Sequence, residues 1–145
     1  MTAETHLFGD AHVRRYLETG GAEGYTWYKG TTILVLFTKG RKSGEQRTHA
    51  LIFSPWGDAY LVVASKGGAD EPPAWFLNLQ ADPDVEVQVK DDRFRARARV
   101  ATPEEKPAMW AEMTKAWPDY DNYQRKTSRE IPVVVLETQS GTTPG

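Results

Sequence analysis

The sequence predicts an α+β fold in which about six antiparallel strands form a small closed or half-closed barrel with three to four flanking helices. Apolar segments rich in β-forming residues follow one another through connections too short for crossover helices, so antiparallel pairing is expected. Only a few short helical segments interrupt them. An open sheet of this size would expose its edge strands, and closure into a barrel avoids this.

Length and composition fit one globular domain over residues 1–145, with loose ends at about 1–8 and 139–145. The 145 residues are 39% hydrophobic and 26% charged, which excludes a disordered chain or a fibrous repeat. A formal net charge of −2 argues against a surface devoted to nucleic acid. The chain shows no cysteine, secretory signal or bilayer-spanning apolar run, so we expect a soluble cytoplasmic protein.

The first part of the chain predicts one helix and three strands. Val13, Tyr16 and Leu17 fall at helical spacing after Asp10, and two glycines end the segment. Three strands follow, over residues 33–37, 47–54 and 59–65. The helix by itself carries little information about function.

Alternating valines before an Asp91–Asp92 turn, and alternating apolar residues after it, predict a β-hairpin. This turn would place Glu86 opposite Arg97, and Asp84 opposite Arg99. We interpret the arginines of the hairpin as a solvated face with cross-strand ion pairs. A surface for nucleic acid is the weaker alternative.

Two helices and a final strand complete the pattern. One helix runs from Pro73 to about Gln80, and residues 102–105 supply an N-cap, a proline and a capping-box glutamate for another. The buried stripe of this second helix contains Met109 and Met113. The last strand covers residues 131–137.

The turn after the first strand collects four cations and one carboxylate within nine residues: Lys39, Arg41, Lys42, Glu45 and Arg47. Such a turn suits an anion clamp, because arginine offers a planar fork of donors and glycines let backbone N–H groups approach a phosphate. A solvated hairpin tip is an equal alternative, since turns commonly collect glycine, serine and lysine.

A glycine loop at residues 65–69 ends an apolar strand just before the first proline-opened helix. Ser65 could donate a hydrogen bond there, and Lys66 could neutralise an anion. A flexible turn is the alternative. Trp75 and Phe76 follow, and they fit either the core or the wall of a cofactor site.

A third cluster is aromatic. Tyr120 and Tyr123 are three residues apart, so one turn of helix would place both on the same face. Together with Trp117 they could roof a pocket and offer phenolic donors, although tyrosines also cover barrel edges.

Several chemistries are not supported by the sequence. His6, His12 and His49 have no metal-binding spacing, so we predict no metal site. The dinucleotide and P-loop glycine patterns are absent, and no Ser-His-Asp constellation can be recognised. The residues alone predict an antiparallel barrel with an anion clamp and an aromatic pocket, without naming a reaction.

Several spaced motifs, in this order, resemble the deazaflavin-dependent nitroreductase family of actinobacteria. The resemblance covers roughly residues 28–137 and rests on residues 38–44 with Arg47-Thr48, 62–68, 73–79, 81–83, 120–124 and 129–133. It implies a split β-barrel that binds coenzyme F420, an 8-hydroxy-5-deazaflavin with a phosphodiester and an oligoglutamate tail. Its reduced form would be the hydride donor.

The resemblance also assigns residues. Tyr120, Tyr123 and Ser65 are expected as orienting hydrogen-bond donors in catalysis. His49, where relatives carry a small polar residue, is expected to pack beside the cofactor. The expected cofactor residues are Arg41, Lys42, Ser43 and Arg47 for the anionic part, Thr48, His49, Ala50, Leu51 and Ile52 for the ring system, and Val63, Ala64, Ser65, Lys66, Gly67, Ala74, Trp75, Phe76, Leu77, Asn78 and Tyr120 for the rest of the slot.

The expected electron acceptors are flat small molecules: quinones, activated enones and nitroaromatic compounds. Trp117 stands where several relatives carry a tyrosine, which removes a phenol from the pocket mouth and weakens the expectation of nitroimidazole activation. Two alternatives are an F420-binding or storage protein without turnover, and a split-barrel enzyme that uses FMN or degrades haem. Any membrane contact is expected to be peripheral at most.

Overall fold

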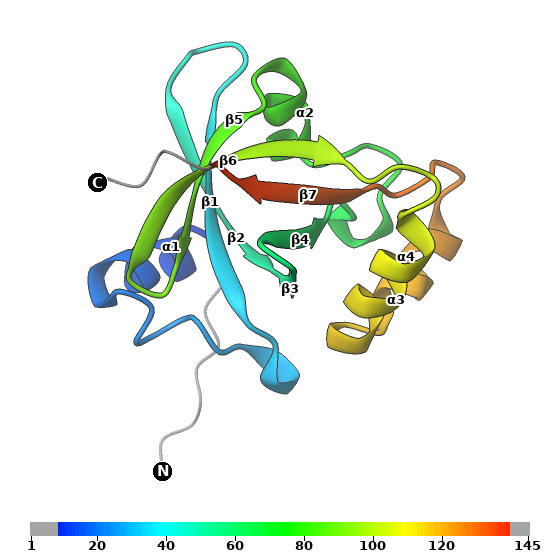
Figure 1. The fold of residues 1–145 in the computed structure, drawn as a ribbon, viewed down its shortest axis with the longest axis horizontal. Helices are drawn as coiled ribbons and strands as arrows, with labels where there is room; N and C mark the ends of the chain where they lie inside the picture. The colour runs from blue at the N-terminus through cyan, green and yellow to red at the C-terminus, as the bar shows by residue number, and fades with distance from the viewer. Residues whose placement is uncertain (1–8, 140–145) are drawn as a thin grey trace.

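The computed structural model describes residues 9–139, in which seven strands form one curled antiparallel sheet (Figure 1). The strand order is β2-β1-β5-β6-β7-β4-β3. This confirms the predicted antiparallel, half-closed barrel. The strands are β1 (Ile33–Lys39), β2 (Gln46–Ile52), β3 (Ser54–Trp56), β4 (Ala59–Val63), β5 (Asp84–Val89), β6 (Asp92–Val100) and β7 (Val133–Thr138).

Four α-helices flank the sheet. Helix α1 lies on one side of it and helices α3 and α4 on the other, while α2 contacts β1 (Figure 1). The helices are α1 (Gly9–Thr19), α2 (Ala74–Ala81), α3 (Lys106–Ala116) and α4 (Asp119–Lys126), with short 3-10 turns η1 (Tyr28–Gly30) and η2 (Lys66–Gly68). None of the helices in residues 9–139 is long and apolar enough to cross a bilayer.

The predicted strand 47–54 is two strands. β2 ends at Ile52 and β3 begins at Ser54, so the prediction of one continuous strand was wrong. Phe53 between them is buried, and its backbone N–H donates to the carbonyl of Thr32. Because β2 and β3 lie at opposite ends of the strand order, this bend carries the chain from one edge of the sheet to the other and half-closes the barrel.

The hairpin register also differs from the prediction. The turn lies at Lys90–Asp91, one residue earlier than expected, and Lys90 adopts a left-handed φ of 57°. Asp84 therefore faces Arg97, and its carboxylate pairs with that guanidinium at 2.9 Å. Moving a two-residue turn by one position shifts every cross-strand pair by two residues. The symmetric Asp91-Asp92 sequence did not reveal at which position the turn lies.

Central strands bury both faces, since their successive side chains point to opposite sides. In β1, Leu34 and Leu36 enter the barrel core, whereas Ile33, Val35 and Phe37 pack with α1. β4 and β7 alternate in the same way, with their second face packed against α3 and α4. That second face includes the predicted Met109 and Met113, both of which are buried.

The predicted capping box is present before α3. The backbone N–H of Thr102 donates to the Glu105 carboxylate at 2.9 Å, and the N–H of Glu105 donates to the Thr102 hydroxyl at 3.2 Å. These contacts fix the turn that precedes the helix, which itself begins at Lys106.

The predicted loose ends lie mostly outside the described residues. Gln139 is the exception: its backbone N–H donates to the carbonyl of Arg95 at 3.2 Å.

Candidate functional site

A cavity of about 330 Å³ lies where α1 and the α3–α4 pair approach each other over β2 and the end of β4. Its surface is mainly apolar and aromatic, with hydroxyl groups and one lysine among the lining residues. The lining residues are Gly9, His12, Trp27, Ile33, Ala50, Leu51, Ile52, Val63, Ser65, Lys66, Gly67, Pro73, Trp75, Trp117, Tyr120 and Tyr123. We call it the aromatic cavity.

One wall of the aromatic cavity is the loop after β4, which is held in an uncommon backbone conformation. Lys66 and Gly67 both have positive φ values, 47° and 64°. Gly68 approaches α4 so closely that a Cβ atom there would lie 2.8 Å from the Tyr123 carbonyl oxygen. This close approach requires glycine and brings Ser65 and Lys66 to the same cavity as Tyr123.

The Arg129 side chain fixes the loop after β4 through hydrogen bonds to its backbone. Its guanidinium donates to three carbonyl oxygens: Ala69 at 2.9 Å, Ala64 at 3.2 Å and Ser65 at 3.0 Å. Thr127 adds a 2.7 Å bond from its hydroxyl to the Asp70 carboxylate. The segment after α4 therefore fixes the backbone on which Ser65 stands.

The predicted aromatic roof exists. Tyr120 and Tyr123 both lie on α4, line the cavity, and meet edge to face with ring centroids 6.0 Å apart. Tyr120 is 5% exposed, and burial raises the pKa of its phenol above the ordinary value. Neither its hydroxyl nor that of Ser65 has a hydrogen-bond partner within residues 9–139, so both can donate to a molecule in the cavity.

A second cavity, of about 300 Å³, is basic. Its lining residues are Gly40, Arg41, Lys42, Ser43, Arg47, His49, Ala74 and Asn78. Neither the two arginines nor Lys42 forms an ion pair with a carboxylate of the described chain. We call it the basic cavity. The turn for which the sequence predicts an anion clamp supplies most of this lining.

Asn78 organises the basic cavity from α2. It is 4% exposed, and its side-chain oxygen accepts from both the backbone N–H and the guanidinium of Arg41, at 3.2 and 3.1 Å. Its amide donates to the Thr38 hydroxyl at 3.2 Å. The turn packs closely at Gly40, where a Cβ atom would lie 2.9 Å from the Ser43 hydroxyl oxygen and 3.2 Å from the Glu45 carbonyl oxygen. These contacts hold the turn in a defined conformation.

His49 lines the basic cavity together with these cations. Burial, aided by the nearby positive charge of Arg47, lowers its pKa to about 4. Its Nε2 atom is 3.5 Å from the Thr38 hydroxyl. The imidazole is therefore neutral near pH 7 and adds no charge to the basic cavity.

The two cavities adjoin along β2 and at the start of α2. His49 lines the basic cavity, and Leu51, the next residue on the same face of β2, lines the aromatic one. The consecutive residues Ala74 and Trp75 line the basic and the aromatic cavity respectively. An elongated ligand with an anionic end and a flat ring end matches this arrangement, because cations without carboxylate partners lie at one end and aromatic walls at the other. The residues present therefore fit coenzyme F420.

Four residues expected to contact the cofactor line neither cavity: Thr48, Ala64, Phe76 and Leu77. Ala64 and Phe76 are buried in the barrel core, so they support the cavity walls from behind. Thr48 faces Phe37 across the β1–β2 ladder, and Leu77 is half-buried on α2. Thr48 lies on the same face of β2 as Ala50 and Ile52, but toward the Gln46 end of the strand and beyond the aromatic cavity.

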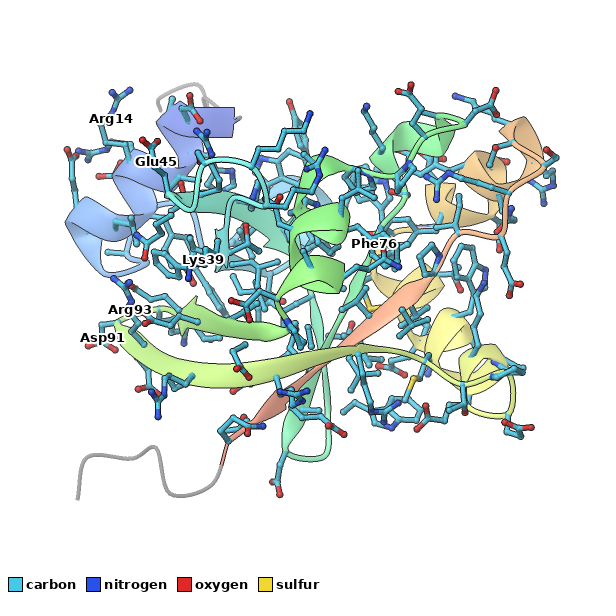
Figure 2. The ribbon with its side chains drawn as sticks, turned by 90° about the horizontal axis from the view of Figure 1, so that it is seen from above. Arg14, Lys39, Glu45, Phe76, Asp91 and Arg93 are labelled. Atoms are coloured by element: carbon cyan, nitrogen blue, oxygen red, sulfur yellow. The ribbon has the colours of Figure 1, made fainter. Side chains whose placement is uncertain are left out.

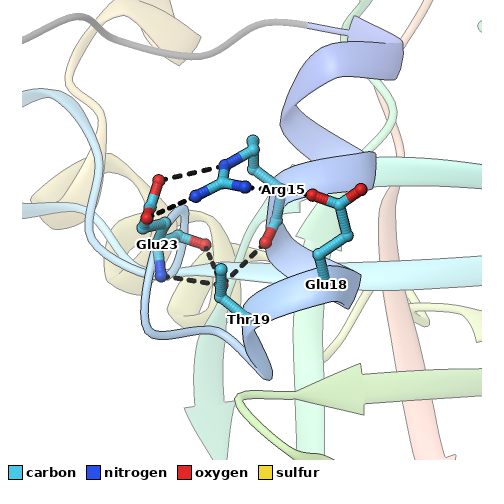
Figure 3. A network of polar contacts seen from close by, with 4 residues as sticks. All are labelled: Arg15, Glu18, Thr19 and Glu23. Carbon is cyan, nitrogen blue, oxygen red and sulfur yellow. Dashed lines mark hydrogen bonds and ion pairs between the residues drawn. The ribbon is translucent and has the colours of Figure 1, made fainter.

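Sequence reasoning missed the residues that α1 and the following loop contribute, chiefly His12 and Trp27. His12 is 3% exposed, and its Nε2 atom lies 2.8 Å from the Gly24 carbonyl oxygen. The Arg15 guanidinium pairs with Glu18 and Glu23 and fixes this loop to the helix (Figure 3). No local pattern could reveal these contacts, because only the tertiary fold brings α1 to β2.

The basic turn and the β5–β6 tip occupy one end of the molecule. Figure 2 shows Asp91 and Arg93 on the same side as Lys39 and Glu45. Arg93 pairs with Glu86 at 2.7 Å, and its guanidinium lies 3.9 Å from the centre of the Phe37 ring. Arg97 and Arg99 are ion-paired as well, which agrees with the predicted solvated, ion-paired face, whereas Arg95 forms no ion pair within residues 9–139.

Comparison with known proteins identifies relatives. The family model described as F420H(2)-dependent quinone reductase matches residues 10–138. A protein of Mycobacterium tuberculosis named F420H(2)-dependent quinone reductase is 41% identical over 128 residues, 86% of this chain and 86% of that protein.

Solved structures agree. An F420-H2 dependent reductase (FDR-A) shares 39% identity with a TM-score of 0.68, covering 72% of this chain and 93% of that one. A structure described as a domain-swapped dimer shares 36% identity with a TM-score of 0.70, covering 86% of this chain and 93% of that one.

Proposed function

Because the chain belongs to the F420H(2)-dependent quinone reductase family, we propose that it uses reduced coenzyme F420 to reduce a quinone-type acceptor in the aromatic cavity. The observation that carries this proposal is the junction of the two cavities. Cations without carboxylate partners line one of them, and aromatic rings and hydroxyl donors line the other.

In this proposal the basic cavity holds the anionic part of the cofactor. Arg41, Lys42 and Arg47 supply the charges, and the Ser43 hydroxyl supplies a further donor. Ala50, Leu51 and Ile52 of β2 line the aromatic cavity where the ring system would lie. Lys66, whose only carboxylate contact in the described chain is Glu71 at 3.5 Å, is placed to neutralise charge on that ring.

Reduced coenzyme F420 supplies a hydride when bound, and the protein provides the surroundings for its transfer. The rings of Trp27, Trp75 and Trp117 exclude water from the aromatic cavity and offer flat surfaces to an aromatic acceptor. The hydroxyls of Ser65, Tyr120 and Tyr123 would donate to the acceptor oxygen, where negative charge develops during reduction. A raised pKa keeps Tyr120 protonated, so it remains a donor.

We extend the acceptor range to activated enones and nitroaromatic compounds, which are also flat and gain negative charge on oxygen. A cytoplasmic location, with peripheral membrane contact at most, is part of the same proposal. The absence of cysteine is compatible with a reducing compartment.

The direct test mixes the purified protein with reduced F420 and menadione and follows oxidation of the cofactor by absorbance. We expect turnover well above the rate without protein. The absence of turnover with every quinone and enone tried would contradict the proposal. If F420 nevertheless bound tightly, the protein would be a carrier or store of F420.

A fluorescence titration with F420 and with FMN separates the two cofactors. We expect F420 to bind more tightly, because FMN carries a phosphate but no glutamate tail for the exposed cations. Tighter binding of FMN would favour the flavin-dependent alternative.

A further inference from the structure

We propose that Trp117 is a positioning residue that fixes the Tyr123 hydroxyl as a hydrogen-bond donor toward the acceptor. Its indole N–H lies 3.2 Å from the Tyr123 hydroxyl oxygen, and both side chains line the aromatic cavity. The inference rests on the proposed function, since the group that receives the Tyr123 hydrogen bond would be the acceptor oxygen.

The chemistry of tryptophan fixes the direction of this hydrogen bond. An indole N–H can donate but cannot accept, so the Tyr123 oxygen must be the acceptor. The Tyr123 O–H has no other partner within the described residues and is left to donate. A donor bonded to the phenol oxygen also polarises the O–H group and strengthens it as a donor.

Both rings are held in place. The backbone N–H of Trp117 donates to the Met113 carbonyl at 2.9 Å, and its carbonyl accepts from the N–H of Tyr120 at 3.1 Å. The Tyr123 ring meets Tyr120 edge to face, and the Lys126 ammonium lies 5.6 Å from its centre. The hydrogen bond from Trp117 to Tyr123 therefore joins two side chains whose positions are set independently of any ligand.

Two residues from the N-terminal part of the chain, Trp27 and Lys29, contact the Trp117 ring. The ring of Trp27 lies 5.8 Å away at a tilt of 30°, and the Lys29 ammonium lies 5.4 Å from the Trp117 ring centre. A cation over an indole withdraws electron density from it, which makes its N–H a stronger donor. Lys29 has a left-handed φ of 59°, and this backbone conformation determines the direction in which its side chain leaves the backbone.

The kinetic test is a double-mutant cycle with Trp117→Phe and Tyr123→Phe, using reduced F420 and menadione. Phenylalanine keeps a ring at each position but removes the N–H or the O–H. We expect Trp117→Phe to lower kcat about three- to tenfold, the value of one hydrogen bond, with KM changing less than about twofold. In the Tyr123→Phe background the same substitution should change kcat less than about twofold.

Trp56→Phe is the matched control. Trp56 lies on β3, is 37% exposed and does not line the aromatic cavity. We expect this variant to keep wild-type kcat. Thermal unfolding of all variants checks that they fold.

A second measurement needs no cofactor. The five tryptophans give five indole cross-peaks in a 1H–15N correlation spectrum, and Trp117→Phe identifies one of them by its loss. We expect Tyr123→Phe to move that cross-peak upfield and to speed its exchange with solvent. An unmoved cross-peak would overturn the inference, because the hydrogen bond would then be absent in solution.

Failure of the inference is distinguishable from failure of the proposed function. If wild-type protein turns over but Trp117→Phe costs the same factor with and without the Tyr123 hydroxyl, Trp117 acts only by packing and the inference is wrong. If the wild type turns over no quinone, the proposed function is wrong and the inference falls with it.

Discussion

Arg41 and Lys42 are both exposed at the basic cavity, but only Arg41 is anchored, through Asn78. The anchored guanidinium offers a fixed fork of donors, and the neighbouring ammonium adds a mobile charge. A phosphodiester or a glutamate carboxylate could accept from both. This pair is therefore the part of the site in which recognition depends most on charge.

Removing both charges, in Arg41→Ala combined with Lys42→Ala, should weaken F420 binding at least about tenfold, since each charge-assisted contact is worth roughly 1.5 to 3 kcal/mol before solvent screening. A cofactor fragment without phosphate and tail should lose much less affinity. Fluorescence titration measures both values. The matched control is Arg97→Ala with Lys115→Ala, which removes two exposed cations outside both cavities.

Equal affinity of the Arg41/Lys42 variant and the wild type would mean that the turn is only a solvated hairpin tip. Equal weakening by the control pair would mean that total charge, and not this cavity, attracts the cofactor.

His49 predicts a pH dependence of stability. Its pKa is lowered to about 4 in the folded chain, against the ordinary 6.5, so between these values only the unfolded chain takes up the proton. The stabilisation is complete above about pH 6.5 and is lost as the pH falls toward 4. The wild type should lose about 1 to 2 kcal/mol more than His49→Gln between about pH 7 and pH 5.

Urea unfolding at the two pH values measures this difference. Parallel losses in the wild type and His49→Gln would show that the imidazole is not kept neutral by its surroundings.

At the scale of elements, the site depends on the contact between the loop after β4 and helix α4. Gly68 meets the Tyr123 backbone there, and Arg129 binds three carbonyls of the loop. The separation of Ser65 from the tyrosine hydroxyls is set by this contact. A change at Gly68 should therefore affect stability and turnover together.

Gly68→Ala should destabilise the protein by about 2 to 4 kcal/mol and lower kcat, because the new methyl group must displace α4. Gly57→Ala is the control: its φ is also positive, 60° against 89°, but a Cβ atom would meet nothing within 4 Å. This control should cost only about 1 kcal/mol, from backbone strain. Thermal unfolding and steady-state kinetics with menadione give both quantities, and equal effects in the two variants would contradict the packing argument.

Elements with a strong periodic pattern could be predicted from the sequence, and those set by tertiary contact could not. The capping box before α3 and the strands around Leu34 and Val134 follow from local chemistry. The break at Phe53 does not, because the run 47–54 reads as one strand until closure of the barrel requires a bend. The two-residue shift of the β5–β6 register is a second example. The residues around this turn resemble one another, so the sequence did not show at which of two positions the chain turns.

At the scale of the whole molecule, the strand order creates the site. Consecutive strands β2 and β3 lie at opposite edges of the sheet, so the barrel stays split beside β2, and residues of α1 and α4 line the aromatic cavity there. The predicted site residues on β2, on the loop after β4 and on α4 meet there. The contributions of His12 and Trp27 were not predictable, since nothing in their local sequence indicates which strand α1 will cover.

The most direct measurement is a crystal structure of the protein with coenzyme F420. We expect the deazaflavin ring in the aromatic cavity against residues 50–52, with the phosphodiester at Arg41, Lys42 and Ser43 and the reactive face of the ring open toward Tyr123. Density for the coenzyme at another surface, or both cavities empty at saturating F420, would contradict this expectation.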